Sequence, residues 1–258
     1  MRIHGHAIAS IGVVLVSFAV SVAARADIVI IGSNSPALAI GMVLSDVQTL
    51  EVPDGSSVRV MSPSGRTQVF KGPLKKSVKE VADKGPADAT LWKTVTARNA
   101  ALSVNAERPR TGATRGMTAA APSPAAAYKF SWQQVPVFAD GDICVEKGAT
   151  LLLVRAGPGK QERVAVVDML GGKRSEVMFA DGRTQAPWPS DLEARVGGFA
   201  FQAEGQPARQ IKLRLIAPLP SAEDAVRVLN GQRCDIQRNA LLDALKDPNF
   251  QVSALVQP

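Results

Sequence analysis

A segment poor in large apolar side chains, residues 105–127, divides the sequence into two regions of strand-like pattern. Seventeen of its 23 residues are Ala, Pro, Gly, Thr or Ser, and Met117 is its only large apolar residue. Such a composition cannot bury a core of its own. We therefore interpret residues 105–127 as an Ala/Pro-rich linker and expect one domain at residues 27–104 and another at residues 128–258.

The region before the linker has the alternating pattern of antiparallel strands. Apolar and polar residues alternate in SVRVM (57–61) and in TQVF (67–70), and a Ser-Pro-Ser-Gly sequence between them suits a tight turn. Val58 and Val60 should point to one face of the sheet and Arg59 to the other. We expect a half-buried hairpin, with further strands at IVII and TLEV. Pro86 and the spacing of later apolar residues predict one helix within residues 85–102.

The region after the linker contains several short runs of strand type separated by glycine-containing turns, a spacing typical of a β-sandwich. The runs are KFSW, DICV, TLLLV, RVAVV, SEVMF, GFAFQ and QIKLRLI. After Pro220 the apolar period becomes helical, and two helices are expected before Asp247 and Pro248 stop the second. The predicted fold is mainly β with minor α: a small N-terminal β-domain with one helix, a linker, then a β-sandwich ending in a helical hairpin.

Residues 1–26 have the pattern of a signal peptide. Arg2 precedes an apolar run, and Ala24-Arg25-Ala26 forms an A-x-A cleavage site before Asp27. An uncleaved anchor helix is the alternative, but serines and a glycine weaken the run for a bilayer span of about 20 residues. We expect cleavage after Ala26 and a periplasmic location. No later segment approaches 18 uninterrupted apolar residues, so no membrane span is expected in the exported chain.

The sequence holds two cysteines, Cys144 and Cys234. In an exported protein an even count indicates a disulfide, with two free buried thiols as the alternative. A bond would close a loop of about 90 residues, worth roughly 4 to 5 kcal/mol in the chain-entropy model. It would join the helical hairpin to the sandwich.

Histidine is confined to His4 and His6, both within the expected signal peptide. The exported chain would therefore lack the general base of Ser-His-Asp and Cys-His catalysis and the commonest transition-metal ligand. Two glycine-containing stretches, at residues 28–41 and 155–161, lack the residues of a dinucleotide or phosphate loop. We expect no cofactor, no metal site and no enzymatic activity. A carboxylate-dependent hydrolase is the remaining catalytic alternative, since two acidic side chains suffice for glycoside hydrolysis.

Arg108, Arg110 and Arg115 lie close together in the linker and are candidate anion contacts, with a solvated linker as the alternative. Because Arg2 and Arg25 lie in the signal peptide, residues 27–258 carry 28 Lys and Arg against 23 Asp and Glu, a net charge of +5. Nucleic acid is not expected as a partner of an exported protein.

The first region also shows a family-like pattern. It reads Gly41-x-x-Leu44, Leu50-x-Val52-Pro53-x-Gly55-Ser56-x-Val58-x-Val60, Gly65 and Phe70-x-Gly72-Pro73. This pattern resembles the small β-domain of FecR-type periplasmic proteins, and the whole chain resembles uncharacterised exported proteobacterial proteins. FecR-type proteins couple periplasmic events to regulators across the inner membrane, so the resemblance implies a docking surface on the hairpin. This chain lacks their cytoplasmic regulator-binding segment and retained transmembrane helix, which leaves a periplasmic interaction role.

We therefore expect a non-enzymatic periplasmic interaction or envelope-accessory module. Its partner would be another envelope protein or, alternatively, an anionic envelope surface, and the linker would let the two domains bind independently. The other functional alternative is a ligand-binding or glycan-binding protein that uses a cleft of the second domain, with Trp132 or Trp188 as a sugar platform.

Overall fold

The computed structural model describes residues 27–106 and 128–251, and it has the predicted mainly β architecture with minor α. The expected signal peptide and nearly all of the expected linker lie outside these ranges. The first region contains β1 Ile28–Ser33, β2 Val43–Leu44, β3 Thr49–Val52, β4 Ser57–Met61, β5 Thr67–Lys71, β6 Leu74–Ser77, α1 Val78–Val81 and α2 Ala89–Ala106. The second contains β7 Gln134–Pro136, β8 Gly141–Glu146, β9 Leu152–Val154, β10 Glu162–Asp168, β11 Arg174–Phe179, β12 Gln185–Pro187, β13 Gly197–Ala203, β14 Arg209–Ile216, α3 Ala225–Gly231 and α4 Asp235–Ala244.

The strands form four sheets. In the first region a four-stranded sheet has the order β2-β1-β4-β5, and β3 pairs with β6. In the second region a five-stranded sheet, β11-β10-β13-β14-β8, shares one apolar core with a three-stranded sheet, β12-β9-β7. This is the predicted sandwich. Most neighbours are antiparallel, but β8 runs parallel to β14 and β7 parallel to β9.

The β4–β5 hairpin has the predicted turn but not the predicted exposure. Gly65 adopts φ 83°, a conformation that favours glycine, and its N–H donates to the carbonyl of Ser62 at 2.9 Å. All five residues of β4 are buried, so the expectation of a half-buried pair is wrong for this strand. Val58 and Val60 enter one core, as expected, whereas Met61 enters a second core on the opposite face.

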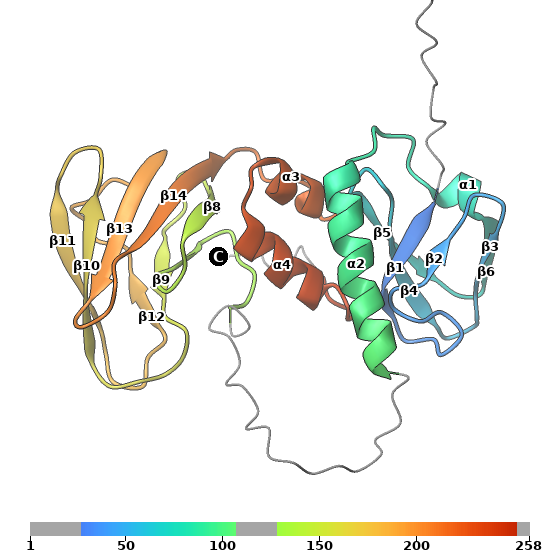
Figure 1. Cartoon of the computed structure of the whole chain (residues 1–258), viewed down its shortest axis with the longest axis horizontal. Coiled ribbons are helices and arrows are strands. Elements are labelled where there is room, and N and C mark those ends of the chain that lie inside the picture. The colour runs from blue at the N-terminus through green and yellow to red at the C-terminus, as the bar shows by residue number, and fades with distance from the viewer. Residues whose placement is uncertain (1–26, 107–127, 252–258) are drawn as a thin grey trace, which may run out of the picture.

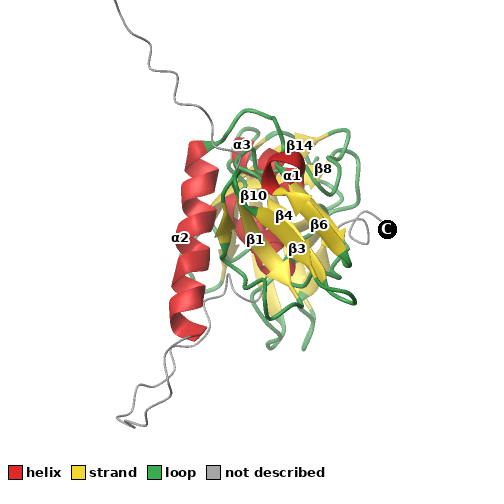
Figure 2. Cartoon of the chain, turned by 90° about the vertical axis from the view of Figure 1, so that its right-hand side faces the viewer, coloured by secondary structure: helices red, strands yellow, loops and turns green. Residues whose placement is uncertain are grey.

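That second core joins the two regions of the chain. The first region contributes Val29 and Ile31 of β1 together with residues of β4 and α2, and the second region contributes mainly α3 and α4. We call α3 and α4 the helical hairpin. Figure 1 shows the hairpin between the sandwich and the N-terminal sheet, and Figure 2 shows α2 along one side of the N-terminal strands. The two regions are therefore packed together, which corrects the expectation that the linker lets them bind independently.

Other differences are local. The segment KFSW, residues 129–132, was predicted as a strand but does not form one. Its aromatic residues Phe130 and Trp132 are both buried and pack edge to face, with ring centroids 5.0 Å apart. The first strand of this region, β7, begins at Gln134 instead. The short strands β2, β6 and β12 were not predicted, because two to four residues carry too little alternation to be recognised. Within the described ranges, no helix has the length and apolar character needed to cross a membrane.

Candidate functional site

Cys144 and Cys234 form the predicted disulfide, with their Cα atoms 5.8 Å apart. Cys144 lies in β8, and Cys234 immediately precedes α4. Both side chains are fully buried in the core that joins the two regions. The bond therefore fastens the helical hairpin to the sandwich, as the sequence predicted. A disulfide is also typical of an oxidising compartment outside the cytoplasm.

A buried polar contact at Gln237 supports the same junction. Gln237 of α4 is fully buried, and its Oε1 accepts a hydrogen bond from the Cys144 N–H at 2.6 Å. Its Nε2 donates to the carbonyls of Cys144 at 2.7 Å and Ser131 at 2.9 Å. Because β8 ends the five-stranded sheet, this amide satisfies backbone groups that would otherwise be unpaired.

Arg59 connects the N-terminal sheet to the end of α4. Its side chain is 5 % exposed, and its guanidinium donates to four backbone carbonyls. The acceptors are Leu245 at 3.0 Å, Asp247 at 2.9 Å, Pro248 at 3.3 Å and Phe250 at 2.5 Å. Burial lowers the pKa of Arg59, and the charge of Asp247 partly opposes this shift. Arg59 therefore supplies donors to the carbonyl of Leu245, which caps α4, and to three carbonyls of the segment that follows the helix.

A groove of about 440 Å³ lies where this junction meets the outer strand of the N-terminal sheet. We call it the β5 groove. Thr67, Val69 and Lys71 line its strand side, and Arg59 also lines it. The remaining lining residues come from the second region: Ala222, Glu223, Leu245, Pro248, Asn249, Phe250 and Gln251. Segments about 180 residues apart in the sequence thus form a single groove.

The strand side of the β5 groove is an open sheet edge. Thr67 donates its N–H away from β4, to the carbonyl of Glu223 at 2.9 Å. The N–H and C=O groups of successive residues point to alternate sides of a strand. Val69 and Lys71 therefore direct these groups to the same side as the Thr67 N–H, away from β4. The structure shows no backbone partner for these groups within residues 27–106 and 128–251. Val69 is also 43 % exposed, so an apolar side chain borders the open edge.

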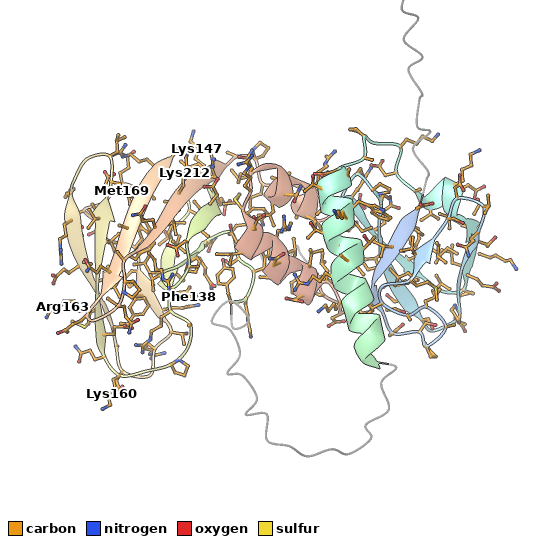
Figure 3. The ribbon with its side chains drawn as sticks, in the orientation of Figure 1. Phe138, Lys147, Lys160, Arg163, Met169 and Lys212 are labelled. Carbon is orange, nitrogen blue, oxygen red and sulfur yellow. A yellow bond between two sulfur atoms is a disulfide. The ribbon has the colours of Figure 1, made fainter. Side chains whose placement is uncertain are left out.

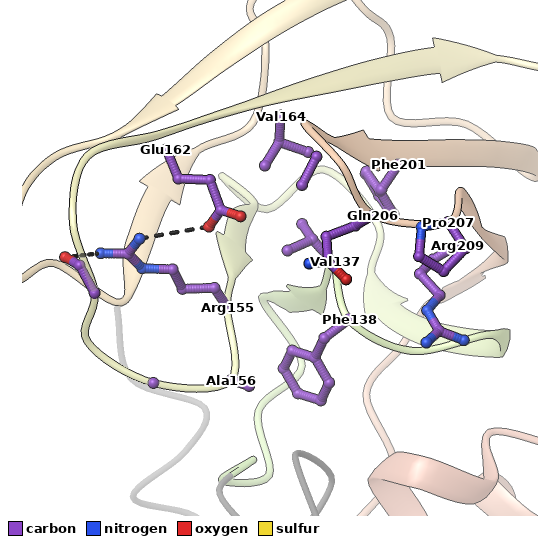
Figure 4. Close-up of a pocket in the computed structure, with 13 residues that line it drawn as sticks. Val137, Phe138, Arg155, Ala156, Glu162, Val164, Phe201, Gln206, Pro207 and Arg209 are labelled. Carbon is purple, nitrogen blue, oxygen red and sulfur yellow. Dashed lines mark hydrogen bonds and ion pairs between the residues drawn. The ribbon is translucent and has the colours of Figure 1, made fainter.

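A second cavity, of about 360 Å³, opens at one end of the sandwich between its two sheets (Figure 4). We call it the sandwich-end pocket. Val164 of β10 and Phe201 of β13 belong to its lining and are each 1 % exposed, so the pocket reaches the apolar core. Arg155 and Glu162 lie on one side of it and Arg209 on the other. The β5 groove and the sandwich-end pocket each combine apolar and charged lining residues, and both are candidate binding sites.

The two tryptophans of the glycan-binding alternative differ in burial: Trp132 is a core residue, and Trp188 is partly buried against the core of the sandwich. Trp132 is 1 % exposed. Trp188 donates its indole N–H to the carbonyl of Leu192 at 2.8 Å and packs edge to face on Phe199. The Trp132 ring is therefore not accessible to a sugar, whereas the Trp188 ring is only partly buried. The linker candidates Arg108, Arg110 and Arg115 lie outside the described residues.

The acidic side chains with a shifted pKa are ion-pair partners of lysine or arginine. Among the residues that the structure describes, the carboxyl groups with a shifted pKa are Asp140, Asp168, Asp191 and Asp243, and the pKa of each is lowered. For Asp168 the main cause is a 2.6 Å hydrogen bond from Arg195. A general acid needs a raised pKa instead. In the described part of the chain, no group of three or more His, Cys, Asp or Glu side chains is placed to hold a metal ion.

Comparison with models of known protein families finds no match, and a search of curated proteins finds no similar sequence. The resemblance to FecR-type domains therefore stays a prediction.

The sequence did not predict the structural roles of Gln237 and Arg59 or the position of Arg209 at a pocket. A signal existed for Gln237, because it lies four residues before Leu241 and so falls on the apolar stripe of α4. The run IVII in β1 was also informative, since a continuous apolar strand is typical of a sheet covered on both faces. Arg209 carries no sequence signal that distinguishes it from other exposed arginines.

Proposed function

We propose that the protein is a non-enzymatic periplasmic interaction module that binds an extended segment of another envelope protein along β5. The observation that carries this proposal is the open edge at Val69 and Lys71, bordered by the β5 groove. An extended peptide binds such an edge by adding a strand, and its alternate side chains occupy the adjacent groove.

The charges of the β5 groove favour an acidic partner segment. Lys71 is exposed on the strand side. The guanidinium of Arg59 bonds to neutral carbonyls, and the structure shows no direct ion pair for it within the described ranges. Glu223, the acidic lining residue, is already paired with Arg66 at 2.6 Å. A carboxylate on the partner would therefore meet excess positive charge.

Site-specific crosslinking tests this proposal. A photo-crosslinking side chain is placed at Val69 in one variant and at Met178 in another, and the captured proteins are identified from intact envelopes. The two positions match well, because each is an exposed apolar residue on a terminal strand, 43 % and 41 % exposed. We expect one discrete protein captured at position 69 and not at position 178, with the crosslink in an acidic extended segment.

A pair of substitutions shows whether the backbone edge is responsible. Val69→Pro removes the outward N–H, whereas Val69→Thr retains it and the β-branched shape. Capture through a neighbouring crosslinker at Lys71 should be lost in the first variant and kept in the second. Equal capture in both variants, or capture of anionic envelope material alone that disappears as salt rises, would contradict strand addition.

The periplasmic location has its own test. We propose that residues 1–26 direct export and are removed after Ala26. The mature protein should then begin at Asp27 and be released with the periplasmic fraction. An N-terminus at Met1 in a membrane fraction would support the anchor-helix alternative.

A further inference from the structure

The sandwich-end pocket has the size and the apolar interior of a small-molecule site. Its volume of about 360 Å³ lies within the roughly 300 to 1,000 Å³ of known ligand pockets. It has room for about a dozen groups the size of a water molecule, at ~30 Å³ each. Val164 and Phe201 are apolar and nearly inaccessible, while Val137 and Phe138 are partly exposed side chains of the same lining.

One of the two cations in this lining is fully occupied by the protein. The Arg155 guanidinium donates to the carbonyls of Arg183, Lys160 and Gly159 at 2.7 to 2.8 Å. It also pairs with Glu162 at 3.4 Å, the interaction drawn on one side of Figure 4. With 8 % of its side chain exposed, Arg155 holds loops together and has little capacity for a ligand.

The second cation, Arg209, is held from outside the pocket and keeps free donors. Its Nη1 donates to Asp140 at 2.9 Å, and Asp140, which does not line the pocket, also accepts from the Gln210 N–H at 2.7 Å. These contacts lower the pKa of Asp140, with the Gln210 hydrogen bond as the main cause. The structure shows no hydrogen bond from Nε or Nη2 of Arg209 to any described residue. The Arg209 side chain is 45 % exposed at the pocket rim.

We propose that the sandwich-end pocket binds a small apolar molecule with one carboxylate, whose apolar body enters between the sheets and whose carboxylate binds Arg209. A guanidinium with free N–H groups favours a planar acceptor with two oxygens. Asp140 positions the guanidinium and neutralises part of its charge, so a single negative charge suits the site better than two. This proposal does not depend on the β5 groove, which lies at the junction with the N-terminal sheet.

Titration of the purified, disulfide-bonded protein with octanoate and with octanol tests the proposal. The two probes share an apolar chain of the same length, and only octanoate carries a charge. We expect saturable one-site binding of octanoate, monitored by calorimetry. Arg209→Gln should weaken octanoate about 10- to 100-fold, the range for a lost charge-assisted hydrogen bond, and change octanol binding less than about threefold.

Two further variants locate the site. Ala203→Leu adds bulk to the pocket lining and should weaken both probes at least about tenfold. Arg163→Gln removes a 63 % exposed arginine at the outer end of the sandwich and should change neither (Figure 3). The proposal is overturned if octanoate shows no saturable binding or if Arg209→Gln weakens both probes equally. It is also overturned if Ala203→Leu folds normally and binds octanoate unchanged. Because Arg209 is exposed, its variant decides the question even if Ala203→Leu is unstable.

Discussion

The side-chain amide of Gln237 makes both backbone hydrogen bonds of Cys144, accepting from its N–H and donating to its C=O. An additional strand would make the same pair of bonds at this edge of the sheet. Cys234, which forms the disulfide with Cys144, lies three residues before Gln237 in the sequence. Cys144 of β8 is thus bound to α4 both covalently and through its backbone, so at this residue the edge of the sheet has no free backbone groups.

Replacing Gln237 should therefore lower the free energy of unfolding strongly, because two buried backbone groups lose their hydrogen-bond partner. Gln237→Leu keeps a side chain of similar size but replaces the amide by apolar groups, which leaves the N–H and C=O of Cys144 buried without partners. We expect a loss of about 2 to 5 kcal/mol in the free energy of unfolding, measured with urea. The matched control is Gln232→Leu at an exposed position of the same hairpin, which should change stability by less than about 0.5 kcal/mol. Equal effects would contradict the role given to Gln237.

Arg59 offers a second test of the junction. Lysine keeps the charge but presents its donors at one point, so Arg59→Lys cannot reach four separate carbonyls. We expect a loss of at least about 2 kcal/mol and faster hydrogen exchange of amides in residues 241–251. Arg163→Lys, on the outer face of the sandwich, is the control and should leave both measurements unchanged. Unchanged hydrogen exchange near residue 245 in Arg59→Lys would contradict the role given to the Arg59 hydrogen bonds.

Gly32 shows how closely the hairpin approaches the N-terminal sheet. A Cβ at this position would collide with the carbonyl oxygen of Leu245 and lie 2.9 Å from that of Lys246. Because both obstacles are backbone atoms, Gly32→Ala must displace the end of α4, at a cost of about 1 to 3 kcal/mol. Gly197→Ala is the control, since nothing lies within 4 Å of its added Cβ. A thermal melt in which the two variants match the wild type would contradict this contact.

The parts of the fold that were predicted are those specified by neighbouring residues. Alternation along β4 and β14, turn residues such as Gly65, and the helical spacing in α4 are all local patterns. The disulfide followed from there being only two cysteines in an expected exported chain. Burial of the second face of β4 was not predictable in this way, because the hairpin that covers it lies about 180 residues away in the sequence.

The candidate sites were harder to predict for the same reason. The β5 groove combines an edge strand with residues 248–251, and nothing in either segment alone indicates that they meet. Trp132 and Trp188 attracted a functional hypothesis because of their side-chain type, yet Trp132 is a core residue and Trp188 packs partly buried against the core. Composition identifies residues able to bind a ligand, but three-dimensional packing determines which of them remain exposed.

The disulfide should account for a large part of the stability of the second region. Cys144 and Cys234 are 90 residues apart, so their bond restricts a long loop in the unfolded chain. The double variant Cys144→Ala/Cys234→Ala should lose about 4 to 5 kcal/mol in the chain-entropy model, measured by urea unfolding. Reduction of the wild type should have an effect of similar size. A loss below about 1 kcal/mol would mean that packing of the hairpin alone holds the junction.

The dependence of stability on pH should have a simple form. Residues 27–258 contain no histidine, so the free energy of unfolding of a protein made of these residues should be nearly constant between about pH 5.5 and 7.5. The pKa of Asp168 is lowered in the folded state, mainly by the hydrogen bond from Arg195. Its stabilising contribution is therefore present above the unfolded pKa of about 3.9 and is lost as pH falls through the folded value.

The variant Asp168→Asn isolates this contribution. It should be less stable than the wild type at pH 7, and the difference should shrink as pH falls below about 4, because the wild-type carboxyl group then becomes protonated. Asp181→Asn is the control, since Asp181 is exposed and the structure shows no side-chain hydrogen bond or ion pair for it among the described residues. Urea unfolding at several pH values measures both variants. A difference for Asp168→Asn that stays constant from pH 7 to pH 3 would show that the carboxylate charge of Asp168 does not stabilise the folded state.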